Sequence, residues 1–290
     1  MELTQQSPNG QSGLSNVGRS KVGVVLLHGL TGMPDEMRPV MRHLTKLGCR
    51  VEVPVLPGHG GTHHELLAAT WQDWYKCTRD TVRELKKDCD QVFVCGLSMG
   101  AILSALVSLD EEVAGFVMLS PTMHYDMQGP KFLRPLMIQL QLRHICKYKL
   151  VGENIYWTEN PPYGLRDPRL QKQVTKAIEA AATGNSNAFG LFRTYWGSLY
   201  QLWLLVDQYR KRAHQIKCPA MIVHSFEDTI TSVNNATEAY LHLGCADKSL
   251  VLLTGCDHVL TLDLCKDQVA QNIGNFVTRI AGVTTEAVAV

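Results

Sequence analysis

The amino-acid sequence predicts an α/β fold, with a mostly parallel central sheet flanked by helices and a helical cap inserted between two strands. Short apolar runs alternate with segments of helical periodicity at 21–121 and again at 216–282. Strands that alternate with helices form parallel sheets covered on both faces. Between residues 122 and 215 the alternation stops, which indicates the cap (lid) insertion.

Seven elements are predicted before the insertion. Residues 1–20, rich in Ser, Asn, Gln and Gly, are expected to form a flexible N-terminal tail. In chain order, the elements are strand 21–27, helix 34–48, strand 50–56, helix 71–88, strand 91–96, helix 98–109 and strand 113–121. Gly48 stands where the first helix would end, and the helix at 71–88 has a basic end that suits the negative pole of the helix dipole.

Four elements are predicted after the insertion, and they resume the same alternation. They are strand 219–226, helix 233–244, strand 248–255 and helix 265–282, followed by a C-terminal tail at 283–290. The insertion itself contains "NPPYG", "TGNSN" and an aromatic, helix-like segment at 188–215. A segment inserted there would lie over the carboxyl ends of the strands, where open α/β sheets bind ligands.

Composition restricts the class of protein. The net charge of +1 over 290 residues argues against a general nucleic-acid-binding surface. The nine cysteines are scattered singly without a CxxC pair, which predicts neither a zinc site nor a disulfide framework and favours the cytoplasm. The amino terminus lacks the apolar core of a signal peptide, and no apolar stretch is long enough to cross a membrane.

The pentapeptide "GLSMG" places Ser98 between two glycines, after the strand-like "QVFVC" and before the helix-like "AILSALVSL". A nucleophile elbow needs this context, because the turn that exposes the serine is strained and crowded and admits only small residues two positions away. Gly96 and Gly100 meet that requirement. The pattern therefore predicts Ser98 as a catalytic nucleophile rather than an incidental serine at an ordinary turn.

A serine nucleophile needs a base and an acid that orients the base, and after an elbow these follow in the order Ser, Asp or Glu, His. Asp228 follows the strand "AMIVHSF", and His258 follows "SLVLLTG". Glu227 and Asp257 are the alternative acids. Strand alternation would point Glu227 the other way, and Asp257 is too close in sequence to His258 to orient its ring, so that it reads as a loop or capping residue.

Ten other histidines compete with His258. His28 lies beside the first strand, and three more lie in an early loop, all before the elbow: His59, His63 and His64. His224 falls inside a predicted strand and reads as a core residue or a neighbour of the site. His258 alone combines a late position with a strand-to-helix loop.

The negative charge that develops on a carbonyl oxygen needs two donors. After an elbow, one is the amide of the residue following the nucleophile, here Met99, and the other comes from the loop after the first strand. That loop reads "LLHGLTGMPDEM", in which glycines allow the backbone to approach a ligand closely. Leu30 and Met99 are therefore the predicted oxyanion donors.

Six segments together resemble the small bacterial carboxylesterases and monoacylglycerol lipases of the α/β-hydrolase fold. They are "VVLLHGLTGMPDEM", "PVLPGHG", "DWYKCTRD", "VCGLSMGA", "HSFEDTITSVNNA" and "GCDHVLTLD". The resemblance covers most of residues 21 to 282, in order. It implies Ser98 as nucleophile, Asp228 as acid, His258 as base, and Leu30 and Met99 as the oxyanion amides.

The cap contributes candidate substrate contacts. Phe192, Trp196 and Trp203 belong to a set of large apolar residues at three- to four-residue spacing, which is expected to line an acyl pocket. The alternative is a helix that buries this face on the main domain. The earlier cap segment mixes "FLRPLMIQLQL" with basic residues, so it either makes transient contact with a lipid surface or is an ordinary solvated face.

The predicted function is hydrolysis of short- to medium-chain carboxylic esters through an acyl-enzyme, with a small acyl ester as partner and no metal or organic cofactor. The same triad would also serve a thioesterase or an acyltransferase. A catalytically silent ligand-binding protein of this fold is the alternative from another class. Stable membrane insertion is not expected, and the oligomeric state is left open.

Overall fold

A computed structural model describes residues 22–125, 147–182, 191 and 193–282, and its main sheet has six strands. Every neighbouring pair in this sheet is parallel, in the spatial order β2-β1-β3-β4-β7-β8. The strands are β1 (Val22–Leu27), β2 (Arg50–Glu52), β3 (Gln91–Leu97), β4 (Gly115–Leu119), β7 (Ala220–Ser225) and β8 (Lys248–Leu253). The predicted parallel sheet is confirmed.

The four central strands are buried on both faces, which explains why their sequences are continuous apolar runs without alternation. Successive residues of β1 nevertheless serve different cores. Val24 and Leu26 belong to one hydrophobic cluster, and Val25 and Leu27 belong to the other. The sheet therefore separates two apolar layers, each covered by its own helices.

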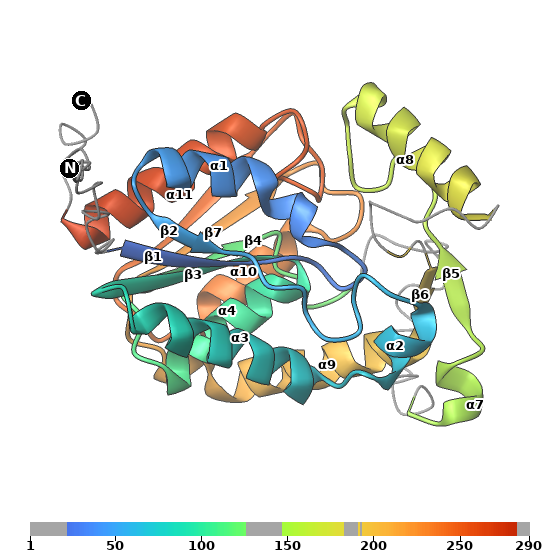
Figure 1. The fold of residues 1–290 in the computed structure, drawn as a ribbon, viewed down its shortest axis with the longest axis horizontal. Helices are drawn as coiled ribbons and strands as arrows, with labels where there is room; N and C mark the ends of the chain where they lie inside the picture. Colours follow the sequence, from blue (N-terminus) through green and yellow to red (C-terminus); the bar gives the residue numbers. More distant parts are fainter. Residues whose placement is uncertain (1–21, 126–146, 183–190, 192, 283–290) are drawn as a thin grey trace, which may run out of the picture.

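Helices α1 (Arg38–Lys46) and α11 (Lys266–Ala281) cover one face of the sheet, and they pack side by side (Figure 1). The short 3₁₀ helix η1 (Pro34–Met37) leads into α1. At the C-terminus of α11, Gly282 takes the left-handed conformation with a φ of 68°, which ends the helix. The helices predicted at 34–48 and 265–282 are confirmed.

The opposite face carries α3 (Trp71–Lys86), α4 (Met99–Asp110) and α10 (Val233–His242). A capping box begins α3, in which Thr70 and Asp73 each bind the other's backbone amide. Every residue of α4 from Met99 to Val107 is buried. This helix is apolar on all sides because it lies between the sheet and its neighbouring helices.

The inserted region at 122–215 contains a two-stranded antiparallel ribbon and several helices. Its elements are α7 (Lys149–Gly152), β5 (Tyr156–Thr158), α8 (Pro168–Ala182), β6 (Arg193–Tyr195), α9 (Trp196–Arg212) and η2 (Ala213–Gln215). The predicted helix at 188–215 was wrong at its start, because residues 193–195 form β6 and the helix begins at Trp196. A three-residue strand gives little signal in the sequence, because its partner β5 is distant: the paired residues Tyr156 and Tyr195 lie 39 positions apart.

Helix α9 packs against α4 and α3, beneath the same face of the sheet (Figure 1). Its side chains Leu202, Leu205 and Tyr209 are buried in the larger hydrophobic cluster. The end of the inserted region is thus part of the layer that covers the sheet. The domain division itself stays a prediction, and the two predicted tails lie outside the described residues.

A short helix, α2 (His63–Ala68), was not predicted; it begins at a capping box formed by Thr62 and Glu65. Within the described ranges, no helix is long and apolar enough to cross a membrane.

The carboxyl ends of β1 and β3 flank the position where the strand order reverses, since the chain leaves β1 toward β2 and returns to β3. Open α/β sheets bind ligands at such a position.

Candidate active site

Ser98 lies at the turn between β3 and α4, as the pentapeptide predicted. Its φ of 57° and ψ of −112° are an unusual conformation for a residue with a side chain. Its amide donates to Leu119 O of the neighbouring strand at 2.8 Å. A residue in such a conformation persists only where the surrounding structure holds it, and this strain is typical of active sites.

The two glycines beside Ser98 are required by close backbone contacts. A Cβ on Gly96 would lie 2.0 Å from Gly100 O, and a Cβ on Gly100 would lie 2.6 Å from Leu27 O. The elbow therefore closes only with glycine at these two positions, which gives a steric reason for the Gly-x-Ser-x-Gly pattern.

The structure brings Asp228 and His258 together. His258 Nδ1 donates to Asp228 Oδ2 at 2.7 Å, and both side chains are buried. Asp228 Oδ1 accepts the amides of Ile230 and Thr231 at 2.8 and 2.7 Å, and Thr231 Oγ1 donates to Asp228 Oδ2 at 3.0 Å. The loop after β7 thus satisfies the carboxylate and aims one oxygen at the imidazole.

The charges of this pair reinforce each other. Burial, the largest effect on Asp228, would raise its pKa, but the charge and hydrogen bond of His258, the charge of His224 and the Thr231 amide together hold the pKa below its ordinary value. Burial is also the largest effect on His258 and would lower its pKa, but the charge and hydrogen bond of Asp228 and the charges of Asp257 and Glu36 together raise the pKa of the imidazole. The pair therefore favours an ionised carboxylate that stabilises the imidazolium.

The two alternative acids have other partners. Glu227 Oε2 accepts the amide of Gly255 at 2.7 Å. Asp257 Oδ1 accepts the backbone amides of Thr229 and His258, at 2.7 and 2.8 Å. Asp257 therefore connects the Asp228 loop to the His258 backbone, whereas Asp228 contacts the ring.

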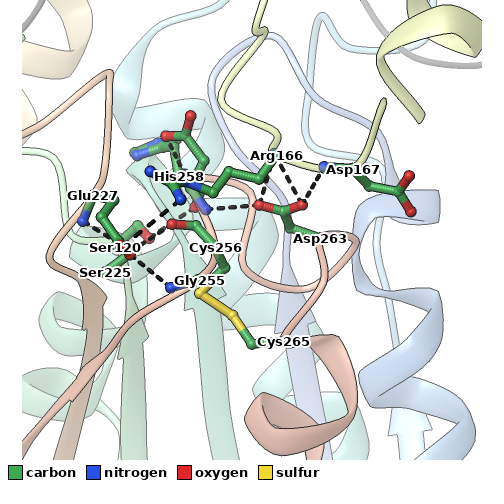
Figure 2. Close-up of a disulfide and its surroundings, with 11 residues drawn as sticks. Ser120, Arg166, Asp167, Ser225, Glu227, Gly255, Cys256, His258, Asp263 and Cys265 are labelled. Carbon is green, nitrogen blue, oxygen red and sulfur yellow. Dashed lines mark hydrogen bonds and ion pairs between the residues drawn. A yellow bond between two sulfur atoms is a disulfide. The ribbon is translucent and has the colours of Figure 1, made fainter. Parts of the chain in front are cut away.

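A second carboxylate, Asp263, fixes the loop that carries His258 (Figure 2). Asp263 is fully buried, and its oxygens accept three backbone amides, those of Asp257 at 2.7 Å and of Arg166 and Asp167 at 2.9–3.0 Å. Arg166 and Asp167 belong to the inserted region. One side chain therefore joins the His258 loop to the segment that enters α8.

A disulfide joins Cys256 to Cys265 and closes the loop that contains His258 and Asp263 (Figure 2). The sequence predicted no disulfide framework and gave no sign of this single bridge, because the two cysteines lie nine positions apart and no CxxC pattern marks them. They meet because the chain turns back at the start of α11. The other cysteines in the described ranges form no disulfide.

The structure places one of the predicted oxyanion donors, Leu30, at the cavity and the other, Met99, directly after Ser98 in sequence. Leu30 and Ser98 line the same cavity, and Met99 is fully buried at the first position of α4. Two buried histidines that the sequence assigned no role bind the Leu30 loop. His28 Nε2 accepts the amide of Leu56 at 3.2 Å, so the ring proton lies on Nδ1, which donates to Gly29 O at 2.9 Å. His59 Nε2 donates to Leu30 O at 2.5 Å.

Thr122, which sequence reasoning missed, contacts the predicted nucleophile directly. It is fully buried just after β4, and its Oγ1 lies 2.8 Å from Ser98 Oγ. Ser98 and His258 line the same cavity, but in the described contacts the serine hydroxyl pairs with Thr122 and not with the imidazole. A hydrogen bond from Ser98 Oγ to the base would therefore have to form in place of, or beside, the contact with Thr122.

The cavity in front of Ser98 has a volume of about 250 Å³. Aromatic rings and two carboxyl groups line it, including Tyr125, Trp157, Glu36 and Glu159. Neither glutamate was predicted as a site residue. In the sequence, Glu36 resembles any acidic residue in the first turn of a helix. Within the described residues, no three His, Cys, Asp or Glu side chains are grouped to hold a metal ion.

Two of the three predicted cap contacts can be placed. Trp196 and Trp203 of α9 pack, partly buried, against the larger hydrophobic cluster, and they are not among the residues that line the cavity. This is the alternative weighed from the sequence, a helix that buries its apolar face. Phe192 and the mixed basic and apolar segment around 132–143 lie outside the described residues.

Comparisons with known proteins show similarity to lipases and to a carboxylesterase. Over 267 residues the chain is 27% identical to the thermostable monoacylglycerol lipase of Bacillus sp. (strain H-257), an alignment that covers 90% of this chain and 92% of that protein. It is 25% identical to a carboxylesterase of Bacillus subtilis (strain 168), covering 89% and 92%. The structure superposes on the monoacylglycerol lipase of Paleococcus ferrophilus with a TM-score of 0.72 at 19% identity, covering 89% and 94%.

The fold of the chain is that of the α/β hydrolases, as predicted. A soluble variant of the Saccharomyces cerevisiae monoglyceride lipase also superposes with a TM-score of 0.72, at 14% identity and with coverage of 92% of this chain and 89% of that one. The family model described as "Serine aminopeptidase, S33" matches residues 18–264. The chain belongs to this S33 family of α/β hydrolases.

Proposed function

We propose that the protein is a serine hydrolase that cleaves short- to medium-chain carboxylic esters through an acyl-enzyme. The observation that carries the proposal is the hydrogen-bonded Asp228–His258 pair in the same cavity as a serine at a strained strand-to-helix turn. The names of the two Bacillus relatives, a monoacylglycerol lipase and a carboxylesterase, support ester substrates.

In the proposed reaction, Ser98 Oγ first leaves Thr122 and turns toward His258. The imidazole Nε2 takes the hydroxyl proton while Oγ attacks the ester carbonyl, and the amides of Leu30 and Met99 bind the oxyanion. Collapse of the tetrahedral intermediate breaks the bond to the alcohol, which leaves with the proton from Nε2. A water molecule then gives a proton to His258 Nε2 as its oxygen attacks the acyl-enzyme. Collapse of the second tetrahedral intermediate breaks the bond between the acyl carbon and Ser98 Oγ, releases the acid, and returns the proton from Nε2 to Oγ.

The cavity supports a compact substrate. Its volume of about 250 Å³ is near the lower end of the range for small-molecule sites, and its lining combines aromatic rings with a few polar groups. A thioester donor or an acceptor alcohol would use the same residues, so a thioesterase and an acyltransferase are the competing functions. The family description also names an aminopeptidase, which requires an amide substrate.

The proposed location is the cytoplasm, and the proposed partner is a small acyl ester rather than nucleic acid. Six cysteines in the described ranges form no disulfide, which supports a reducing compartment, whereas the Cys256–Cys265 disulfide counts against it. Thiol alkylation of the native protein in cell extract measures whether this disulfide is present. The division into a core at 21–121 and 216–282 and a cap at 122–215 is also part of this proposal.

The experiment that tests the proposed function is intact-mass labelling with a fluorophosphonate. The wild type is expected to gain one adduct, and Ser98→Ala none. Ser108→Ala is the matched control, because Ser108 lies on the same helix and donates to Ala105 O, away from the cavity. Equal labelling of wild type and Ser98→Ala, or no labelling of folded wild type, contradicts the proposal.

A substrate panel then separates the competing functions. Nitrophenyl esters of increasing chain length, monoacylglycerols, an acyl-CoA and an aminoacyl nitroanilide are compared by kcat/KM at one pH. Ester hydrolysis that exceeds thioester and anilide hydrolysis supports the proposal. A preference for acyl-CoA or for the anilide contradicts it and identifies the thioesterase or the aminopeptidase.

A further inference from the structure

The loop that carries the predicted oxyanion donor Leu30 is a tight turn, residues Gly29–Gly32, here called the oxyanion turn. Its Gly32 amide donates to Gly29 O at 3.3 Å. The carbonyls of Gly29 and Leu30 are also bound by His28 and His59, as described above. These contacts fix the carbonyl side of the turn.

The amide side of the turn is bound by a carboxylate. Glu36 Oε2 accepts the Gly29 amide at 3.1 Å, and Glu36 lines the same cavity as Ser98 and His258. We propose that Glu36 is a positioning residue for catalysis: by binding the Gly29 amide it holds the oxyanion turn in the conformation that presents the Leu30 amide to the substrate carbonyl. This inference rests on the proposed function.

The fit between Glu36 and the turn is close. A Cβ on Gly32 would lie 2.2 Å from both carboxylate oxygens, so the carboxylate occupies the space that a side chain at position 32 would take. A Cβ on Gly29 would lie 3.6 Å from Glu36 Oε2 and equally far from Ser98 Cβ. The Glu36 carboxylate and Ser98 therefore lie on two sides of the space next to Gly29, and the close contact with Gly32 leaves the carboxylate little freedom to move.

The base of the Glu36 side chain is rigid. Pro34 begins η1, and the next residue after Glu36, Met37, is fully buried in the core beneath α1. The Glu36 amide also donates to Met33 O at 3.0 Å, which closes the first turn of η1. Because the helix is anchored in the core, a hydrogen bond from the turn to Glu36 connects the oxyanion turn to the protein interior.

The charge of Glu36 also acts on the catalytic base. Burial, with a smaller effect from the charge of Glu159, raises the pKa of Glu36 to about 7, against the lowering effects of the Gly29 hydrogen bond and the charge of His258. The neighbouring acid and base on this segment, Asp35 and Arg38, pair with each other. Ionised Glu36 in turn contributes to the raised pKa of His258, after the larger effect of Asp228 and that of Asp257.

Two substitutions separate hydrogen bonding from charge. Glu36→Gln keeps the shape and a carbonyl oxygen that can accept the Gly29 amide, but it removes the negative charge. Glu36→Ala removes both. Asp35→Asn is the matched control, because it removes a carboxylate from the adjacent position of η1, where Asp35 is exposed and pairs with Arg38 outside the cavity.

The experiment measures kcat and KM for a nitrophenyl ester, together with inhibition by an alkyl boronic acid, which forms a tetrahedral adduct with the serine. Loss of a whole oxyanion donor costs about 10²–10³ in kcat, and a misplaced donor costs less. We expect kcat to fall about tenfold in Glu36→Gln and about a hundredfold in Glu36→Ala, with KM changed by less than about twofold. Boronate inhibition should weaken in parallel, and Asp35→Asn should match the wild type.

The pH profile supplies a readout that a merely space-filling residue would not change. Ionised Glu36 raises the pKa of His258, and its own pKa of about 7 leaves it ionised over the upper part of the acid limb. In that pH range, the kcat/KM profile of Glu36→Gln should move to lower pH relative to wild type. Thermal unfolding of each variant shows whether it is folded. If Glu36→Ala does not fold, Glu36→Gln alone decides: an unmoved acid limb and unchanged kcat overturn the inference.

Other results also overturn it. A raised KM with unchanged kcat would make Glu36 a substrate contact, and a wild-type kcat in folded Glu36→Ala would remove its role. Should the wild type hydrolyse no ester, the proposed function fails while this inference remains testable, because the phosphonyl oxygen of a fluorophosphonate also needs the oxyanion donors. Labelling of Glu36→Ala at the wild-type rate then overturns it, and labelling at least tenfold slower supports it.

Discussion

Replacing Asp263 with asparagine tests how the His258 loop is held to the inserted region. The wild-type carboxylate accepts three backbone amides, those of Arg166, Asp167 and Asp257. Asparagine offers one carbonyl oxygen and turns an NH₂ group toward at least one of those N–H groups. Hydrogen bonds to a charged group contribute about 1.5–3 kcal/mol each and neutral ones about 0.5–1.5, so the loss is about 1 kcal/mol for each amide.

Summed over three amides, Asp263→Asn should lower the free energy of unfolding by about 3 kcal/mol. In a chain of this size, that loss lowers Tm by roughly 6–12 °C. Urea unfolding followed by circular dichroism measures the free energy, and a parallel ester assay measures kcat. The kcat should fall as well, because Asp257, whose amide Asp263 binds, also binds the backbone of His258.

Asp267→Asn is the control for Asp263→Asn. Asp267 is exposed in the first turn of α11, where an acidic residue contributes only about 0.3–1 kcal/mol through the helix dipole. If the two variants unfold within about 0.5 kcal/mol of each other, the three amides do not depend on the carboxylate. That result would refute the assignment of Asp263 as the connection between the His258 loop and the inserted region.

Three further predictions concern the elbow, the disulfide and the base. Gly100→Ala should unfold at lower temperature and lose fluorophosphonate labelling, because its Cβ would lie 2.6 Å from Leu27 O. Gly48→Ala is the control, because its Cβ would meet nothing within 4 Å. It should lose only about 1–2 kcal/mol of folding free energy, from placing alanine in the left-handed conformation, and should keep its labelling. Cys265→Ser should lower the free energy of unfolding by about 2.5 kcal/mol, from the chain entropy of the loop that the disulfide closes, and dithiothreitol should have no effect on this variant while destabilising the wild type. Hydrolysis needs neutral His258, so the acid limb of kcat/KM should lie above the ordinary histidine value of 6.5; an inflection at or below 6.5 would contradict the raised pKa. The same shift implies that the contribution of His258 to stability is present below its unfolded pKa and is lost as the pH rises through its folded pKa.

The parts of the site that could be predicted from the sequence depend on local patterns. A strand, two glycines and a helix define the elbow at Ser98, and chain order selects Asp228 and His258. The structure places these last two residues in direct contact. Such features follow from short stretches, because the backbone geometry at the turn restricts which residues it accepts.

The residues that the sequence did not reveal depend on contacts between distant segments. Thr122 reaches Ser98 only because β4 lies beside β3, and the Cys256–Cys265 pair depends on how the loop before α11 turns back. Glu36 has no sequence signal of its own, since its role comes from the space left by Gly32. The spacing of apolar residues predicted an apolar helix face that contains Trp196, but it did not show that this face packs on the larger hydrophobic cluster rather than lining the cavity.

The packing of α9 has a consequence for engineering the specificity of this protein. A graft that exchanged all of residues 122–215 for the cap of a relative would also remove Leu202, Leu205 and Tyr209 from the cluster beneath α4. It would remove the amides of Arg166 and Asp167, to which Asp263 is bound, as well. A graft that exchanged only residues 168–195 would keep the amides bound by Asp263 and the buried side chains of α9 in this protein.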